Sequence, residues 1–312
     1  GEPKVMWCKS DKRMEKILKR CPSAHERYFP TFWAHTSYLQ MFVFVLYQMI
    51  HNQKLQYKQH VLKTTDEGEV RCDEFVPAKG DELPESAPIC LFLHTITGDS
   101  QSCNEFVRFA FSKGWRPFVL CRRGHFNKLK SPRFNVMGDA EDTKIMVNYV
   151  ADLYPQAKFM GAVGISAGSG QLVLYIGQQK ESFPVHAAVS LCPAYSMRTA
   201  FLDWNKRHPL LSKYILRALK NRFLYPNSEL LRKHHHYEKL ERSDSVHDFI
   251  VNSVHFAGFD SFESYLKHSD PMAHYHGSKI PCLVLNSKDD PICLERNICY
   301  DLGDKSHNYA LV

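Results

Sequence analysis

Short apolar runs alternate with longer segments of helical periodicity from about residue 70 onward. The strand-like runs lie at 89–93, 117–120, 159–163 and 187–191, and the helical patterns lie at 103–113, 138–152 and 167–179. Such alternation predicts right-handed βαβ units around a parallel sheet that is covered on both faces. We therefore predict an α/β fold with a mostly parallel central sheet.

The alternation stops after residue 191. Residues 197–270 predict helices and loops without a buried strand, and strand patterns return at 281–286 and 308–312. One sheet domain with a helical insertion fits this order better than two domains in tandem. We place the insertion, a helical lid, at about 195–275.

The first part of the chain has a different character. Residues 1–65 are basic, aromatic and without regular periodicity, so we treat them as an N-terminal extension of a main domain at 66–312. The most apolar run, 41–47, is too short to cross a bilayer, which needs about 20 residues. No transmembrane segment is therefore expected within the chain.

Composition narrows the class of protein further. The 312 residues are 44% hydrophobic and 23% charged, which excludes disordered, collagen-like and coiled-coil chains. None of the ten cysteines forms a C-x-x-C pair, so a zinc ribbon or a thioredoxin-type motif is not expected. Several cysteines lie in apolar runs, where a free thiol behaves as a small hydrophobe. We expect reduced thiols and an intracellular location.

The positive charge is concentrated in one segment. The chain has a formal charge of +7, and residues 201–240 contain nine basic and three acidic residues. A solvated helical face is the simplest interpretation, and docking of the lid on an anionic membrane surface is the alternative. Nucleic-acid binding is not expected, because no recognised module accompanies the charge.

The motif that carries chemistry is Gly164-Ile165-Ser166-Ala167-Gly168, a G-x-S-x-G. A buried-strand run enters it and a helical pattern leaves it, which is the context of a nucleophile elbow. The elbow exposes the serine hydroxyl above the carboxyl edge of the sheet. Ser166 is thus the candidate nucleophile, and the Ala167 N–H is one candidate oxyanion donor.

An oxyanion hole needs a second donor, and the loop 94–98 follows the first strong strand. We expect this loop to face the elbow and take the Ile96 N–H as the second donor. His94 is interpreted as a structural loop residue.

The triad acid is expected after a late strand. Ser287-Lys288-Asp289-Asp290-Pro291 follows the strand pattern at 281–286, and we choose Asp290 because Pro291 fixes the turn after it. Asp289 is then a turn or capping residue. His307 precedes the last strand, on the wrong edge of the sheet, so the triad histidine is expected to be missing from this chain.

Two further clusters of polar residues have a chemical and a structural interpretation. His234-His235-His236 resembles a metal cluster, but consecutive side chains on a helix diverge, so we expect a solvated helix face. Arg122-Arg123 is expected to brace the loop after its strand, with one arginine paired to a carboxylate. No metal or organic cofactor is expected.

Motifs through most of the chain carry a resemblance. They are Pro30-Thr31-Phe32-Trp33-Ala34 with Leu39-Gln40, the loop 94–98, Cys121-Arg122-Arg123-Gly124-His125, Ser131-Pro132-Arg133, residues 139–142, the elbow, and residues 286–291. In these motifs the sequence resembles the α/β-hydrolase superfamily. Within it, the resemblance is to AB hydrolase family 4, which includes the abhydrolase-domain proteins 1, 2 and 3 and the yeast and bacterial medium-chain esterases.

The resemblance implies acyl-ester hydrolysis on lipids, with Ser166 as nucleophile and Asp290 as acid. It also implies an endoplasmic-reticulum or other membrane location through an N-terminal anchor, expected before Gly1. The chain departs from the pattern at His94-Thr95 in the oxyanion loop and at Ser169, where glycine is common. The terminal Gly-Gly-His segment is expected after Val312.

These observations predict a serine hydrolase on short- or medium-chain acylglycerols or phospholipids. The chain of 312 residues is itself expected to be nearly inactive, because the triad histidine is missing. The alternatives are an alcohol O-acyltransferase (a medium-chain ester synthase) and a non-catalytic protein that binds a lipid or a partner. The oligomeric state does not follow from the sequence.

Overall fold

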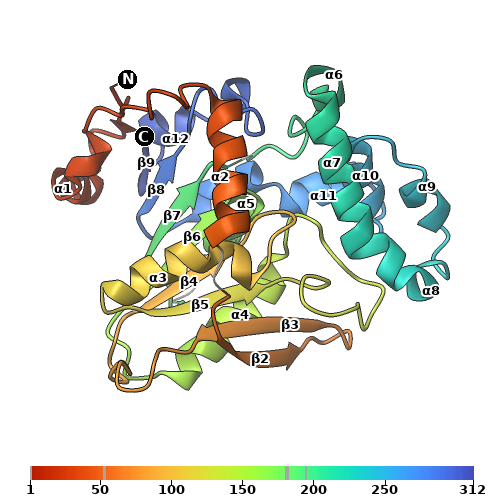
Figure 1. Ribbon diagram of the computed structural model, residues 1–312, viewed down its shortest axis with the longest axis horizontal. Coiled ribbons are helices and arrows are strands. Elements are labelled where there is room, and N and C mark those ends of the chain that lie inside the picture. Colours follow the sequence, from red (N-terminus) through yellow and green to blue (C-terminus); the bar gives the residue numbers. More distant parts are fainter. Residues whose placement is uncertain (1, 52–53, 180–182, 194) are drawn as a thin grey trace.

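The computed structural model describes residues 2–51, 54–179, 183–193 and 195–312, and their strands form one nine-stranded sheet (Figure 1). From edge to edge the strand order is β1-β9-β8-β7-β6-β4-β5-β3-β2. The strands are β1 Met6–Trp7, β2 Tyr57–Lys63, β3 Glu69–Phe75, β4 Ile89–Leu93, β5 Arg116–Cys121, β6 Met160–Ile165, β7 Ala187–Leu191, β8 Cys282–Leu285 and β9 Tyr309–Leu311. All neighbours from β9 across to β5 are parallel, and the pairs nearer the two edges are antiparallel.

The predicted α/β class with a mostly parallel sheet is confirmed. Each strand run predicted from residue 89 onward corresponds to a strand of the sheet, and β4 and β7 have the predicted bounds. Because these strands are parallel, their carboxyl ends lie at one edge of the sheet. The loops after β4, β6 and β8 therefore meet at that edge.

Helices cover both faces of the sheet, because side chains along a strand point alternately to opposite faces. Leu91 of β4 packs with α4 (Ala140–Leu153) and α5 (Ala167–Gln178) in the main buried cluster. Phe92 of the same strand packs on the opposite face with α3 (Asn104–Ser112). Burial on both faces explains why the central strands are continuous apolar runs in the sequence.

Between β7 and β8 the described chain contains helices and turns but no strand. The helices are α6 Trp204–Arg207, α7 Pro209–Leu219, α8 Ser228–Leu231, α9 Tyr237–Glu241, α10 Val246–Ser253 and α11 Phe262–Ser269, with a π-helical turn at Lys220–Leu224. Their apolar side chains form a second buried cluster that includes Ile96 and Ala167. The insertion therefore packs on the sheet domain where β4 and β6 end. Figure 1 shows these helices to the right of the sheet.

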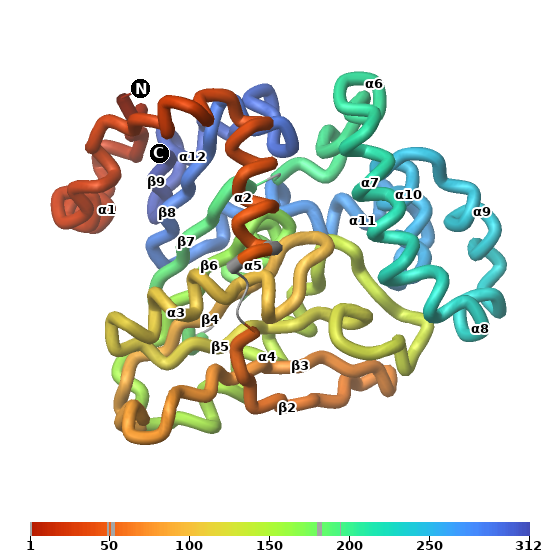
Figure 2. Tube along the Cα trace, in the orientation of Figure 1, coloured from red at the N-terminus to blue at the C-terminus, as the bar shows by residue number. Residues whose placement is uncertain are grey.

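The described residues within 1–65 form more regular secondary structure than the sequence predicts. β1 pairs with β9 and β2 pairs with β3, so this segment adds a strand at each edge of the sheet. Between those strands lie α1 (Lys12–Lys19) and α2 (Ser37–His51), and α1 packs Met14 against Ala310. The two termini consequently lie near each other (Figure 2). Edge strands that are short or half-solvated lack the continuous apolar run that marks a central strand, which explains the difference.

Candidate active site

Ser166 occupies a sharp turn between β6 and α5, with φ 53° and ψ −113°. A positive φ is rare for a residue with a side chain and costs about 1–3 kcal/mol. The Ser166 N–H donates to the carbonyl oxygen of Leu191 (2.8 Å), and the Ser166 carbonyl accepts from the N–H of Ser169 (2.9 Å). The strained turn is thus held from β7 on one side and from α5 on the other, as in a nucleophile elbow.

Steric contacts explain both glycines of the G-x-S-x-G motif. A Cβ on Gly168 would lie 2.0 Å from the carbonyl oxygen of Leu93, at the end of β4. A Cβ on Gly164 would lie 2.5 Å from the carbonyl oxygen of Gly168. Only glycine at both positions allows α5 to begin directly against the central strands.

Ser169 strengthens the same turn. Its side chain is buried. Its hydroxyl donates a hydrogen bond that is shared between the carbonyl oxygens of Gly164 (2.8 Å) and Leu191 (2.7 Å). Serine at this position therefore links the ends of β6 and β7, which glycine could not do.

The loop after β4 is held through its carbonyl oxygens. Arg122 donates to the carbonyl of Thr95 (2.6 Å), and Arg222 of the helical insertion donates to that of Thr97 (3.1 Å). In a trans peptide the C=O and the following N–H point in opposite directions. The Ile96 N–H therefore points away from Arg122.

Ile96 and Ala167 follow the neighbouring strands β4 and β6, and both residues belong to the same buried cluster. Among the hydrogen bonds of the described residues, neither backbone N–H has a protein acceptor. For Ala167 this is expected, because the first N–H groups of a helix have no partner within it. The two residues proposed as oxyanion donors thus follow neighbouring strands at the same edge of the sheet.

His94 and His125 form a buried pair beneath this loop, with ring centroids 4.4 Å apart. His94 Nδ1 lies 2.9 Å from the carbonyl of Thr95, and His125 Nδ1 lies 2.7 Å from that of Gly98, so each Nδ1 carries the proton. Burial lowers the pKa of both imidazoles well below the ordinary value, and the charge of Arg122 lowers it further. Both rings are neutral supports of the loop.

Replacing His125 with asparagine is expected to weaken the acid dependence of folding stability. The unfolded histidine binds a proton below about pH 6.5 while the buried one does not, so stability falls as the pH decreases below that value. One histidine contributes up to about 1.4 kcal/mol per pH unit to this loss. Asparagine keeps a donor for Gly98 and does not titrate.

Urea unfolding at about pH 7.5 and about pH 5 measures this difference. His35, which is exposed, provides the matched control through His35→Asn. Equal losses of stability on acidification in the wild type and in His125→Asn would contradict the neutral, buried state of His125.

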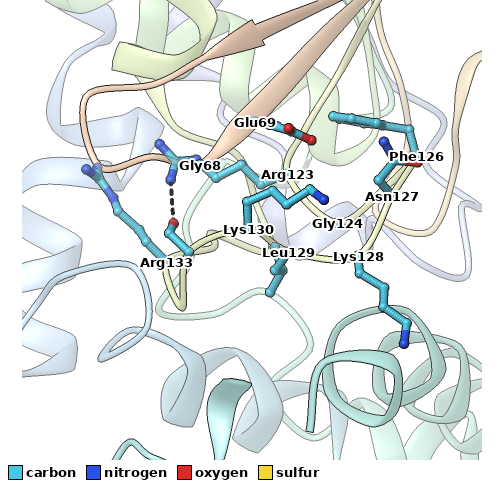
Figure 3. Close-up of a pocket in the computed structure, with 11 residues that line it drawn as sticks. Gly68, Glu69, Arg123, Gly124, Phe126, Asn127, Lys128, Leu129, Lys130 and Arg133 are labelled. Atoms are coloured by element: carbon cyan, nitrogen blue, oxygen red, sulfur yellow. Dashed lines mark hydrogen bonds between the residues drawn. The ribbon is translucent and has the colours of Figure 1, made fainter. Parts of the chain in front are cut away.

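Arg123 forms the carboxylate pair that was predicted for one of the two arginines. It donates to both oxygens of Asp142 (2.6 and 2.7 Å) and to Asp66 (2.6 Å). Figure 3 shows Arg123 beside Gly68 and the loop that carries Lys128 and Lys130. The hollow that these residues line measures only about 10 Å³, the space of about one water molecule. Arg123 therefore has a structural role.

Asp290 lies in the loop after β8, and β7 separates that strand from β6. Its Oδ1 accepts from the N–H groups of Ile292 (2.7 Å) and Cys293 (2.9 Å), which fixes the carboxylate orientation. Asp289 instead accepts a hydrogen bond from the Ser287 hydroxyl, the turn role expected for it.

Two cysteines that the sequence predicts to be no more than small hydrophobes lie near Asp290. Cys293 Sγ donates to the carbonyl of Cys192 (2.9 Å). Burial raises the pKa of the Cys293 thiol well above its ordinary value, and a hydrogen bond with Ser166 acts in the opposite direction. Burial, together with the Asp290 carboxylate, raises the pKa of Cys192 to about 12. Both thiols are therefore protonated at neutral pH and unreactive.

No histidine in the described part of the chain hydrogen-bonds to Ser166 or Asp290. His307 precedes β9, and its Nε2 lies within hydrogen-bonding distance of Ser10 Oγ (3.3 Å). As expected, this places His307 at the edge of the sheet opposite to the one that carries Ser166. His208 and Asp290 line one cavity of about 570 Å³, but Ser166 does not line it. Among the described residues, the candidate nucleophile Ser166 and the candidate acid Asp290 therefore have no imidazole between them.

His234, His235 and His236 lie in a turn between α8 and α9, so the predicted helix face is wrong. His236 stacks on His255, with ring centroids 3.5 Å apart. Among the described residues no three His, Cys, Asp or Glu side chains have an arrangement that could hold a metal ion.

Replacing Ser166 with glycine is expected to stabilise the fold relative to Ser166→Ala. Both changes remove the hydroxyl, but only glycine adopts φ 53° without strain. Relief of about 1–3 kcal/mol exceeds the entropic cost of glycine, about 0.5–1 kcal/mol, so a net gain of about 1 kcal/mol is expected. Urea unfolding of the two variants measures it. A glycine variant less stable than the alanine variant would show that the turn is not strained.

The sheet order, the serine elbow after β6, the carboxylate after β8 and the helical insertion between β7 and β8 define an α/β-hydrolase fold. No family model matches the sequence. The chain is similar to phospholipase ABHD3 of Bos taurus, with 26% identity over 310 residues that cover 95% of this chain and 73% of the relative. It is also similar to monoacylglycerol lipase ABHD2 of Mus musculus, with 24% identity over 319 residues that cover 95% and 74% of the two chains.

Solved structures support the fold independently. An arylesterase structure superposes with a TM-score of 0.53 at 13% identity, covering 97% of this chain and 89% of the other. The Pyrobaculum calidifontis esterase superposes with a TM-score of 0.51 at 15% identity, covering 95% and 87%. At this identity the likeness concerns the fold alone.

Proposed function

We propose that the protein is a serine hydrolase that cleaves carboxylic esters of lipids, namely short- or medium-chain acylglycerols or phospholipids. The observation that carries this proposal is Ser166, held at a positive φ at the carboxyl edge of the sheet. The names of the relatives, a phospholipase and a monoacylglycerol lipase, support a lipid ester as the substrate. The described residues need no metal or cofactor for this chemistry.

In the proposed reaction, Ser166 Oγ attacks the ester carbonyl and its proton passes to an imidazole that Asp290 orients. The Ile96 and Ala167 N–H groups stabilise the negative charge on the tetrahedral oxygen. Collapse of this intermediate expels the alcohol, which takes the proton from the imidazolium and leaves an acyl-serine. Water then attacks the acyl-serine by the same route and releases the fatty acid.

The chain of 312 residues is proposed to turn over esters slowly by itself, because none of its described histidines is placed to accept the Ser166 proton. Loss of a triad member leaves only the rate that binding and the oxyanion donors supply. A second candidate function, lipid binding without turnover, is favoured by the Cys293 thiol at Ser166. In that case the protonated Cys293 thiol next to Ser166 would not act as a base.

The surroundings of the site suggest where the protein works. All ten cysteines are free, which supports a reducing, intracellular compartment. The basic segment 201–240 belongs to the helical insertion that packs over the elbow, which supports contact with an anionic membrane surface. We propose an intracellular membrane, such as the endoplasmic reticulum, as the source of the substrate.

The test uses the full-length protein, with and without Ser166→Ala. Monoacylglycerols and phospholipids with short, medium and long acyl chains are supplied, and released fatty acid is measured. We expect release from short- and medium-chain lipids that disappears in the Ser166→Ala variant. Binding of these lipids without any release would support the second candidate instead.

A further inference from the structure

Residues 28–50 expose an unusual number of large apolar side chains. Twelve of the twenty such side chains that are exposed in the described chain lie here: Tyr28, Phe29, Phe32, Trp33, Tyr38, Leu39, Phe42, Phe44, Val45, Leu46, Tyr47 and Ile50. The stretch 28–53 contains no Asp, Glu, Lys or Arg. We call these twelve side chains the α2 surface. An apolar surface of this extent marks an interaction site.

Helix α2 carries most of this surface, and most of its described large apolar side chains are exposed rather than buried. Ile50 is 74% exposed and Phe42 is 58% exposed. None of the described α2 side chains joins a buried cluster. In Figure 1 α2 and α7 both lie on the near side of the molecule.

One end of α2 touches the helical insertion close to the candidate site. The Tyr38 hydroxyl hydrogen-bonds to Nδ1 of His208, and their ring centroids are 5.7 Å apart. Tyr38, His208 and Asp290 line the same cavity of about 570 Å³, a volume in the range of ligand pockets. The α2 surface is therefore continuous with an opening at the acid side of the site.

Helix α7, which begins next to His208, presents a face that combines apolar and basic groups. Leu210 is 85% exposed and Tyr214 is 71% exposed, one turn apart on the same face. Lys213 and Arg217 are also exposed, and neither has an ion-pair partner among the described residues. Apolar side chains flanked by unpaired cations complement a bilayer that carries anionic lipids.

We infer that the α2 surface inserts into one leaflet of an anionic bilayer, with Lys213 and Arg217 against its headgroups. The aromatic side chains suit the boundary between headgroups and acyl chains. No described helix is both long and apolar enough to span a bilayer, and α2 has 15 residues, so insertion is interfacial. This inference builds on the proposed function, because it gives a membrane lipid a path to the site.

The test is co-sedimentation of the folded protein with vesicles of phosphatidylcholine alone or with about 30% phosphatidylserine. We expect binding that is strongest to the anionic vesicles, and a blue shift of the fluorescence of Trp33, absent in Trp33→Phe. The double variant Phe42→Ser/Ile50→Ser is expected to bind about a hundredfold more weakly, because each buried apolar side chain adds about a factor of ten.

Matched controls separate the surface from general effects of polarity and charge. Val61→Ser/Val76→Ser removes two exposed apolar side chains near the far edge of the sheet and is expected to leave binding unchanged. Lys213→Glu/Arg217→Glu is expected to abolish the preference for phosphatidylserine, whereas Lys58→Glu/Lys63→Glu on β2 is expected to retain it.

Three results would overturn the inference. They are absence of wild-type binding to either vesicle, equal loss in the valine control, and a vesicle-free dimer that Phe42→Ser/Ile50→Ser dissociates. The last result would assign the α2 surface to a second copy of the chain. Ser166→Ala is expected to bind vesicles like the wild type. Vesicle binding without hydrolysis would therefore reject the proposed function alone, and hydrolysis without vesicle binding would reject this inference alone.

Discussion

Ser166→Ala is expected to remove all enzyme-dependent ester hydrolysis, including the rate that added imidazole restores. The 312-residue chain should hydrolyse p-nitrophenyl butyrate slowly, because no described histidine is placed to take the Ser166 proton. Free imidazole can take that proton from solution. A positioned base contributes about 10²–10⁴-fold to the rate. Free imidazole, which is not positioned, should therefore raise the slow hydrolysis rate of the chain by about tenfold or more.

The control is built into the comparison. Imidazole hydrolyses the ester without protein, and the rate measured with Ser166→Ala gives that background. Ser112→Ala, which changes an exposed serine of α3, is expected to respond to imidazole like the wild type. An imidazole response that survives in Ser166→Ala would exclude Ser166 as the nucleophile.

Gly168→Ala is expected to cause the largest loss of stability among single changes at the site. Its Cβ would lie 2.0 Å from the carbonyl oxygen of Leu93, which is backbone in the centre of the sheet. Strand β4 is paired with β5 and β6, and α5 begins in the hydrogen-bonded turn at Ser166, so neither is free to move away. Overpacking usually costs about 1–3 kcal/mol, and a backbone clash of this kind should cost about 3 kcal/mol or more.

Urea unfolding compares this variant with Gly161→Ala in the same region of the fold. A Cβ on Gly161 would make only an ordinary contact, 3.4 Å from the Trp115 ring, so that variant should stay within about 1 kcal/mol of the wild type. Equal stabilities of the two variants would mean that α5 does not start directly against β4.

The sequence predicts the centre of this fold well because the central strands are buried on both faces. The runs at 89–93 and 187–191 are continuous apolar segments, and the structure turns both into strands with those bounds. The elbow could be predicted for a similar reason, since Gly164 and Gly168 respond to local backbone contacts. Local steric contacts and burial restrict which residue types can occur, so they can be predicted from the sequence pattern.

Features that depend on long-range contacts were not predicted. Strand β1 has two residues and exists through its pairing with β9, some 300 positions away. Arg222 reaches the loop after β4 only because the helical insertion folds back over it. Cys293 lies near Ser166 and follows Asp290 by only three residues. This short spacing from the candidate acid is the one local signal in the sequence that could have placed Cys293 at the site.

For the exposed helix α2, the sequence shows the apolar residues but not their exposure to solvent. The apolar run at 41–47 is obvious in the sequence, but its length excludes a membrane span and its surroundings do not indicate a core. Only the structure shows that Phe42 and Ile50 face solvent rather than the sheet. An interfacial role could thus be inferred only after the fold was known.

The most direct test of the account is the site of reaction with a fluorophosphonate, measured by peptide mass spectrometry in the presence of imidazole. We predict an adduct on the peptide that contains Ser166, with faster labelling when imidazole is added. The Ser166→Ala variant should carry none. A folded wild-type chain without an adduct, or an adduct that persists in Ser166→Ala, would contradict the claim that this fold presents Ser166 as a nucleophile.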